Sequence, residues 1–347
     1  MKLLIITQTV DKNHPVLGFF HRWIEEFAKH FEKITVIGNA TGIYSLPPNV
    51  EVHSLGKYPE SGIKTSKRDP FERIVRSIRF LLLVWSLRKN YDAVLVHMTP
   101  EHLVLGGPVF KLFGKRAYLW YNHTAESPWL SFAAGFAKNI FHTSPYAATA
   151  RFPQAKRMPA GIDTELFRPR GVKKIPKSMY FQGRVSPAKK VHILLEAFAN
   201  LYEQGIAERL TVVGPEDTKY TAPLKEKYRD LIKSGAVSFL GPREHASTPE
   251  LYESHAVSVN LTDRGNYDKT VLESMACGTP VVVSSDAFAD IVPKELMFRE
   301  GNAQSLADRL ERLLSSNSLS HISHDAIAAQ SLSVLAQKIK QTISSAL

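Results

Sequence analysis

Short runs of β-branched and other apolar residues alternate with amphipathic stretches along almost the whole chain. This alternation is typical of strand–helix–strand units that build a parallel sheet with helices on both faces. A first helix is predicted where Phe20, Trp23, Ile24, Phe27 and Phe31 recur at helical spacing. After residue 302 the pattern is helical. The predicted strands lie at 2–7, 34–38, 50–53, 93–97, 116–120, 139–143, 178–182, 210–213, 237–240, 257–261 and 281–284.

Two doubly wound domains are expected from the length and from one break in the pattern. A chain of 347 residues exceeds what one hydrophobic core usually organises. Residues 167–177 are poor in apolar side chains and contain two prolines, which favours a linker. We therefore expect an N-terminal domain at 1–166, a linker at 167–177, a C-terminal domain at 178–322, and a helix at 323–347 that packs back toward the first domain.

Composition excludes several classes of protein. Hydrophobic residues make up 44% and charged residues 22% of the chain, which is typical of a globular protein and not of a disordered one. The longest apolar run, Phe80 to Trp85, is far shorter than the roughly 20 residues of a membrane-spanning helix, and the first residues do not resemble a signal peptide. Cys277 is the single cysteine, and no Cys/His cluster has zinc-ligand spacing. We expect a cytoplasmic protein.

The formal net charge of +11 lies almost entirely in the first half, because residues 1–170 hold 23 Lys/Arg and 13 Asp/Glu and residues 171–347 hold 21 and 20. Eight cations and two acids fall between residues 64 and 89, which indicates an anionic partner. Nucleic acid is not expected, since base-stacking aromatics are not interleaved with these charges. Within this segment one apolar stripe, expected to pack on the sheet while the arginines face outward, consists of Ile74, Ile78, Leu81, Leu82 and Trp85.

One loop after a predicted strand carries two candidate functional cations. Open parallel sheets bind ligands beyond the carboxyl ends of their strands. Residues 182–190 join a strand to a helix and bring Arg184 and Lys189 to one strand end, where they could clasp a diphosphate. A solvated basic loop is the alternative interpretation.

A second loop, at 263–280, leads into a helix that Gly278 and Pro280 should end. Asp268 is the predicted N-cap, which would leave the amides near Thr270 and Val271 pointing outward as an anion site. Glu273, one turn further along, suits the two hydroxyls of a ribose. An ion pair with a surface cation is the alternative for Glu273.

As an ordered set, these and other segments resemble family-4 retaining glycosyltransferases with the GT-B fold. The resemblance implies an α/β protein of two doubly wound Rossmann-like domains, with a cleft between them and C-terminal helices packing back. The matching segments are Gly183-Arg184 with Lys189, 212–215, 239–241, Leu251-Tyr252, 271–282, Gly161-Ile162-Asp163 with Phe167, and the loop 15–18.

The resemblance implies transfer of a sugar from a nucleotide-sugar donor to a saccharide or lipid-linked acceptor in glycan or envelope polysaccharide synthesis, with no cofactor besides the donor substrate. It also implies that His123, Arg184 and Lys189 are the catalytic residues. No metal is expected, because an Asp-x-Asp pair is missing and these cations can stabilise the leaving diphosphate. The implied donor-binding residues are Gly18, Arg184, Lys189, Asn266, Tyr267, Asp268, Lys269, Thr270, Val271 and Glu273.

Two residues depart from the family pattern. Gly265 stands where a first glutamate is usual, eight positions before Glu273, with Asp263 nearby as a candidate substitute. Lys190 occupies a position that is commonly glycine. A nucleotide-sugar epimerase or hydrolase on the same fold, or a degenerate nucleotide-sugar-binding protein, is therefore the alternative function. The basic segment at 64–89 further suggests peripheral docking on the inner face of an anionic membrane.

Overall fold

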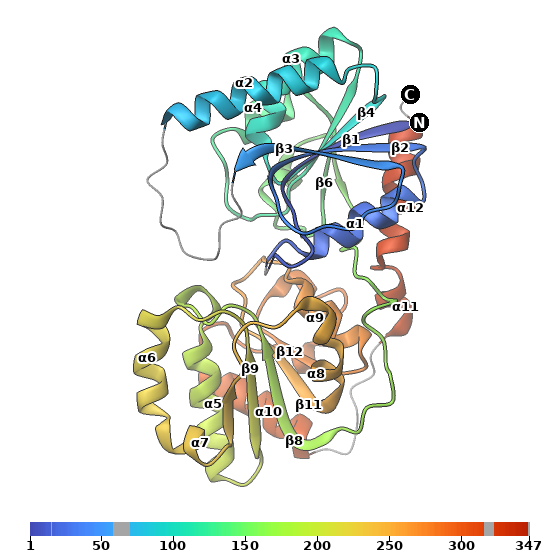
Figure 1. The fold of residues 1–347 in the computed structure, drawn as a ribbon. Helices are drawn as coiled ribbons and strands as arrows, with labels where there is room; N and C mark the ends of the chain where they lie inside the picture. Colours follow the sequence, from blue (N-terminus) through green and yellow to red (C-terminus); the bar gives the residue numbers. More distant parts are fainter. Residues whose placement is uncertain (15, 58–69, 316–322, 346–347) are drawn as a thin grey trace. The chain divides into compact units, whose positions relative to one another are not determined.

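The computed structural model of the protein describes residues 1–14, 16–57, 70–315 and 323–345 (Figure 1). The chain forms two compact units, each with its own parallel sheet. Unit 1 consists of Met1–Gly161 and Leu332–Leu347, and unit 2 of Ile162–Ser331. Two doubly wound α/β units are the fold class that the sequence predicts.

Within the described residues, the sheet of unit 1 has seven parallel strands in the order β3-β2-β1-β4-β5-β6-β7. The central strands are buried on both faces, which explains their continuous apolar sequences. The strands are β1 (Lys2–Val10), β2 (Lys33–Thr41), β3 (Val50–Lys57), β4 (Ala93–His97), β5 (Arg116–Trp120), β6 (Ala137–His142) and β7 (Ala155–Arg157).

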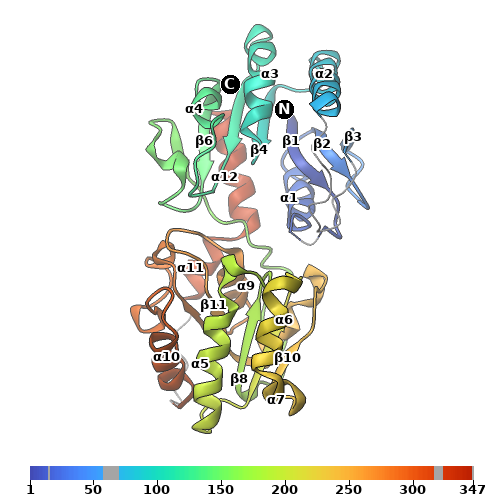
Figure 2. The same cartoon turned by 90° about the vertical axis from the view of Figure 1, so that its left-hand side faces the viewer.

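Helices cover both faces of this sheet (Figures 1 and 2). Alternate side chains of β1 point to opposite faces, so Leu3 and Ile5 pack under one layer and Leu4 and Ile6 under the other. The first layer is α1 (Phe19–Ala28) and α12 (Leu332–Ser344), and the second is α2 (Pro70–Ser86), α3 (Pro100–Leu112) and α4 (Leu130–Ala134). The 3₁₀ turn η1 spans Ala148–Arg151.

The packing of α2 differs from the prediction. Of the five residues in the predicted stripe, only Leu81 packs against the core, and the other four are exposed. The helix is held instead by its opposite face, where Phe80 and Val84 are buried, and by Leu87 just after its end. The expectation was wrong because both faces of α2 are apolar, and helical periodicity alone does not tell which face meets the sheet.

Within the described residues, the sheet of unit 2 has five parallel strands in the order β10-β9-β8-β11-β12. Helices α5 and α10 pack together on one face, and α8 and α9 lie on the other. The strands are β8 (Ile175–Gln182), β9 (Arg209–Val213), β10 (Val237–Phe239), β11 (His255–Asn260) and β12 (Val281–Val283). The helices are α5 (Val191–Glu203), α6 (Thr218–Lys227), α7 (Arg229–Lys233), α8 (Pro249–Ser254), α9 (Lys269–Ala276), α10 (Ala303–Ser315) and α11 (His324–Ala328), with 3₁₀ turns η2 (Pro187–Lys189), η3 (His245–Ser247), η4 (Asp286–Phe288) and η5 (Lys294–Leu296).

The unit boundary falls at Gly161–Ile162, before the linker expected at 167–177. That segment belongs to unit 2, because the buried carboxylate of Glu253 accepts hydrogen bonds from the backbone amides of Arg170, Gly171 and Val172 at 2.8–3.1 Å. The expected helix at 323–347 is two helices: α11 stays with unit 2, and α12 joins the core of unit 1.

None of the helices in the described ranges combines the length and the apolar character needed to cross a bilayer.

Candidate functional site

The exits of β8 and β9 meet backbone to backbone. A Cβ atom added to Gly214, just after β9, would lie 1.9 Å from the carbonyl oxygen of Gly183, just after β8. The amide of Gly183 also donates to the carbonyl of Val213 at 2.9 Å. Only glycine permits so close an approach, and it fixes the turn that carries Arg184 and Lys189.

The two cations of this turn are in different states. The amino group of Lys189 forms an ion pair with Asp268 and lies 3.4 Å from the hydroxyl of Thr262. Arg184 is exposed, and within the described residues it has no ion pair. The structure therefore joins Lys189 to the α9 loop and leaves Arg184 in solvent.

The backbone conformation at Lys190 explains why glycine is common at this position. Its φ is +48°, the left-handed conformation that disfavours side chains with a Cβ atom. Its amino group lies 2.6 Å from Oδ1 of Asp263 and also bonds to Glu300. Burial would lower the pKa of Lys190, but these two carboxylates outweigh it and raise the pKa. Asp263, the candidate substitute for the missing glutamate, is thus engaged with Lys190.

Asp268 is the N-cap of α9, as predicted. Its Oδ1 accepts from the amide of Thr270 at 3.4 Å, and its backbone oxygen accepts from the amide of Val271 at 3.3 Å. Burial would raise the pKa of Asp268, but Lys189 beside it outweighs this effect and lowers the pKa. The amides expected to point outward as an anion site therefore already have acceptors, because the capping aspartate supplies the negative oxygen that a phosphate would bring.

Glu273 is buried and holds two partners that sequence reasoning missed. Its Oε1 lies 2.9 Å from Nε2 of His245, and its Oε2 accepts from the hydroxyl of Tyr252 at 3.2 Å. Burial would lower the pKa of His245, but the Glu273 carboxylate outweighs it and raises the pKa. No local pattern could reveal these partners, since they lie 28 and 21 residues away in the sequence.

The other predicted donor contacts mainly hold the loop itself. Tyr267 is buried and packs on Phe288, with ring centroids 4.3 Å apart. The backbone oxygen of Asn266 accepts from the Ser285 hydroxyl at 2.7 Å. The side chain of Val271 is fully buried. Lys269 and Thr270 are partly exposed, and burial lowers the pKa of Lys269 to about 7 although Glu273 opposes the shift.

In unit 1, Gly18 precedes α1 and is required by its own loop. A Cβ atom there would lie 2.7 Å from the carbonyl oxygen of Lys12 and 2.8 Å from that of His14. The ring of His14 further accepts from the amide of Leu17 at 2.9 Å. Pro15 of the matching loop 15–18 lies outside the described residues.

His123 lies exposed beyond the carboxyl end of β5, with the ring of Tyr121 packed edge-on at 5.6 Å. Neighbouring protein atoms partly desolvate the imidazole and lower its pKa. Asn122 ties this strand exit to β6, because its side-chain oxygen accepts from the amides of Thr143 and Ser144 at 2.8 and 2.9 Å. His123 is thus presented by a fixed backbone.

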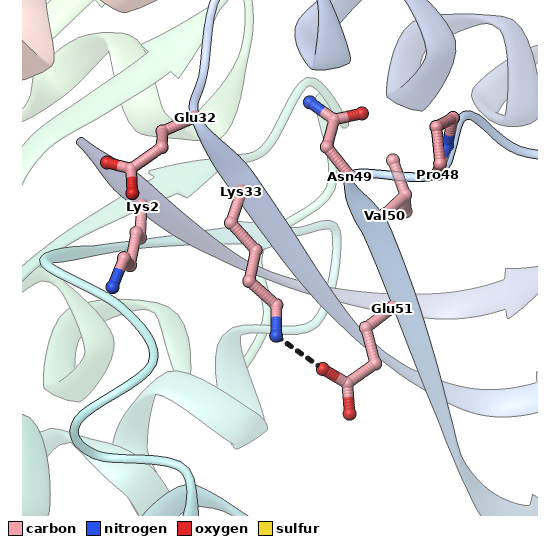
Figure 3. A pocket seen from close by; sticks show the side chains of 7 residues that line it. All are labelled: Lys2, Glu32, Lys33, Pro48, Asn49, Val50 and Glu51. Atoms are coloured by element: carbon pink, nitrogen blue, oxygen red, sulfur yellow. Dashed lines mark ion pairs between the residues drawn. The ribbon is translucent and has the colours of Figure 1, made fainter.

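A pocket of about 620 Å³ lies elsewhere in unit 1 (Figure 3). Lys33 and Glu51 form an ion pair of 2.7 Å across it. It opens at the amino ends of β1, β2 and β3, opposite to the edge where parallel sheets bind ligands. In the part of the chain that the structure describes, no group of three His, Cys, Asp or Glu side chains is placed to hold a metal ion. The pocket lining is Lys2, Glu32, Lys33, Pro48, Asn49, Val50 and Glu51.

Comparison with known proteins relates part of the chain to a family. Residues 176–316 match the family model described as glycosyl transferases group 1. The match covers most of unit 2 and less than half of the chain. The D-inositol 3-phosphate glycosyltransferase of Salinispora arenicola is 34% identical over 112 residues, which are 30% of this chain and 25% of that protein. The alpha-monoglucosyldiacylglycerol synthase of Streptococcus pneumoniae is 27% identical over 128 residues, 37% of this chain and 29% of that protein.

Solved structures extend the likeness to the whole fold. Anabaena Alr3699/HepE in complex with UDP and glucose superposes with a TM-score of 0.77 at 19% identity, covering 99% of this chain and 100% of the other. WaaG, a glycosyltransferase involved in lipopolysaccharide biosynthesis, gives 0.67 at 15% identity and 99% of both chains. The predicted GT-B fold is confirmed.

Proposed function

We propose that this chain transfers a sugar from a nucleotide-sugar donor to a saccharide or lipid-linked acceptor, in glycan or envelope polysaccharide synthesis. The observation that carries the proposal is the group of Lys189, Arg184 and Glu273 on the β8–α5 turn and α9 of a domain that matches a glycosyl transferase family. Arg184 and Lys189 bind the diphosphate, and Glu273 holds the ribose. The relatives that bind UDP or act on a lipid support this class of donor and acceptor.

Donor binding on this site requires an exchange of partners. Lys189 is neutralised by Asp268, so a diphosphate has to replace the Asp268 carboxylate at the amino group and at the start of α9. Arg184 is exposed and needs no such exchange. The remaining donor contacts fall to Asn266, Lys269 and the backbone of the α9 loop.

The transfer proceeds with retention, as we infer from the family resemblance. The bond between the anomeric carbon and the diphosphate oxygen breaks, the acceptor oxygen bonds to the same face of that carbon, and the acceptor proton passes to the departing diphosphate. Arg184 and Lys189 stabilise the charge that develops on the leaving group. Because these cations do that work, we propose that no metal ion takes part. In unit 1, we propose Gly18 as a donor-binding residue and His123 as a catalytic residue, as the family resemblance implies.

We also propose that residues 64–89 bring the protein to the inner face of an anionic membrane. Arg73 and Arg79 are exposed on α2, which supports an electrostatic attraction to acidic lipid headgroups. Lys64, Lys67 and Arg68 lie outside the described residues. A membrane-bound protein would meet a lipid-linked acceptor without a search through solution.

A thermal-shift screen tests the donor site. Nucleoside diphosphates and nucleotide sugars that bind the folded state should raise the melting temperature in proportion to the logarithm of their concentration above the Kd. The set that binds identifies the donor nucleotide. If no nucleotide shifts the melting temperature at millimolar concentration, the donor site is assigned incorrectly.

A further inference from the structure

The carboxylate of Glu273 is held by two side chains, one from a neighbouring helix and one from the turn before that helix. The hydroxyl of Tyr252, on α8, donates to Oε2 at 3.2 Å, and Nε2 of His245, on the 3₁₀ turn η3, lies 2.9 Å from Oε1. Helices α8 and α9 pack against each other, which brings both partners to Glu273 (Figure 1).

These two bonds leave room on the carboxylate for a ligand. A carboxylate can accept about four hydrogen bonds, two on each oxygen. In the described part of the chain, Glu273 accepts one bond on each oxygen, so one acceptor position on each oxygen remains. The two neighbouring hydroxyls of a ribose are donors that match such a pair of positions. The protein partners can therefore orient Glu273 without blocking the ribose.

The two partners of Glu273 differ in their surroundings. Tyr252 is buried, and its ring packs on the rings of Phe167 and Tyr180, with centroids 6.1 and 4.9 Å away. Burial and the neighbouring Glu273 carboxylate raise the pKa of Tyr252, so its hydroxyl keeps its proton. Tyr252 is thus a fixed donor within the core of unit 2. The side chain of His245, in contrast, is 33% exposed.

The fold nevertheless fixes the place of His245. The hydroxyl of Thr248 donates to the backbone oxygen of His245 at 2.9 Å. The imidazole lies beside the ring of Phe167, with centroids 4.9 Å apart and planes at 59°. Thr248 and Phe167 are both buried. Buried residues therefore hold His245 against Glu273, although part of its side chain meets solvent.

We propose that His245 is a positioning residue for the donor, because it fixes the Glu273 carboxylate in the orientation that binds the ribose. This inference deepens the proposed function and rests on it, since a ribose at Glu273 is part of that proposal. A glutamate without this partner has more rotamers, and ligand binding must then restrict them at a cost in affinity. His245 restricts them before the donor arrives.

A purely structural role is the competing account. His245 would then pair with Glu273 only for the stability of unit 2, and its removal would affect all ligands of the site alike. A positioning role acts through the ribose hydroxyls. Its removal should weaken only those nucleotides that carry these hydroxyls, so the two accounts differ in a measurable selectivity.

The test compares nucleoside 5′-diphosphates with their 2′,3′-dideoxy forms in calorimetric titrations of the full chain. The dideoxy form keeps the base and the diphosphate but lacks both hydroxyls, so the ratio of the two affinities reports on the ribose contact. The probes are UDP, GDP, ADP and CDP, with the dideoxy form of each one that binds. Circular dichroism and melting curves show that each variant folds.

Two variants of similar size separate hydrogen bonding from packing. His245→Leu can still pack on Phe167 but has no donor, whereas His245→Gln keeps an N–H group that can donate to Glu273. The matched control is His192→Ala. His192 is an exposed histidine on α5, on the other face of the sheet, and its ring nitrogen lies 2.7 Å from the hydroxyl of Tyr220.

We expect wild type to prefer the ribonucleotide at least roughly tenfold, because the dideoxy form loses two hydrogen bonds to a charged group. His245→Leu should lower this preference at least roughly fourfold, with the affinity for the dideoxy form unchanged within about twofold. His245→Gln and His192→Ala should keep the preference within about twofold of wild type.

The positioning role is wrong if His245→Leu keeps the wild-type preference, or if it weakens both forms of the nucleotide equally. It is also wrong if His245→Gln behaves like His245→Leu, since the donor group would then be irrelevant. Glu273→Gln separates these failures from failure of the proposed function. Loss of the preference in Glu273→Gln but not in His245→Leu removes the inference alone. Wild type without the preference, or Glu273→Gln that keeps it, removes the ribose assignment and the inference together.

Discussion

The candidate binding site of unit 2 and the surface of helix α2 in unit 1 differ in whether their side chains already have partners. At the strand exits of unit 2, Lys189 is paired with Asp268, Lys190 with Asp263 and Glu300, and Glu273 with His245. On α2 of unit 1, the large apolar side chains of Ile74, Ile78 and Leu82 face solvent. A ligand that binds Lys189, Lys190 or Glu273 must replace their existing partners, so only a ligand that offers equivalent charges gains free energy there. A partner of this α2 face would displace only water, so that contact would select weakly for chemical detail.

The largest expected effect concerns the rigidity of the unit 2 surface. Gly214→Ala should destabilise the protein by about 3 kcal/mol or more, because the new Cβ atom would strike the backbone of Gly183. The control Gly205→Ala has a positive φ of +70° but open space around the Cβ position, so it should cost about 1 kcal/mol. Urea unfolding measures both. Equal costs would mean that the two strand exits are not locked together.

The next effect concerns the paired cation. Lys189→Ala and Arg184→Ala should each lower kcat/KM at least roughly tenfold, since both charges are worth more in the transition state than in the ground state. The control is Lys225→Ala, which removes a lysine that pairs with Glu216 on the surface of the same unit. If folded variants of Lys189 and Arg184 keep the wild-type kcat/KM, these two residues do not bind the diphosphate.

The pairing itself can be tested by removing its negative member. Asp268→Asn should tighten the binding of a nucleoside diphosphate by roughly three- to fivefold, because the competing carboxylate is gone while asparagine still caps α9. Asp217→Asn is the matched control, since Asp217 caps α6 through the amides of Lys219 and Tyr220. Calorimetric titration gives the affinities. Weaker binding by the Asp268 variant would show that this carboxylate assists the donor.

The smallest effect is a pH dependence at Glu273. The pKa of His245 is raised in the folded protein, so its pair with Glu273 stabilises fully below the unfolded pKa of about 6.5 and loses that contribution as pH rises through the folded value. His245→Asn should therefore destabilise the protein more at pH 6 than at pH 9. Melting curves at the two pH values measure this difference, which should be at most about 1 kcal/mol in the free energy of unfolding. In a Glu273→Gln background this difference should vanish. A pH-independent effect of His245→Asn would contradict the pairing.

Local sequence predicted most of the fold. Strands β4 and β5 have the bounds that their apolar runs predict, because both are buried on both faces. Strand β7 was missed, since three mostly exposed residues at a sheet edge carry no apolar signal. The α1 stripe is buried as predicted, whereas α2 has apolar residues on two faces and only tertiary packing chooses between them.

The candidate site was predictable only where its residues share a strand exit or a helix start. The Asp268 cap and the Lys189 turn come from local patterns in adjacent loops of one sheet edge. The partners that neutralise the site do not, because Glu300 and His245 reach it from other elements. Sequence gives the residue types at a site, and the fold decides which of them are already paired.

The central claim is that nucleotide-sugar binding on unit 2 leads to transfer. The most direct measurement follows donor and products by NMR, with the donor nucleotide found by thermal shift and with saccharide and lipid-linked acceptors. We predict that donor is consumed only when acceptor is present, that one nucleoside diphosphate is released per new glycosidic bond, and that the anomeric configuration of the sugar is retained with a chelator in the solution. Donor that is hydrolysed or epimerised without any acceptor, or bound and never consumed, would contradict the claim.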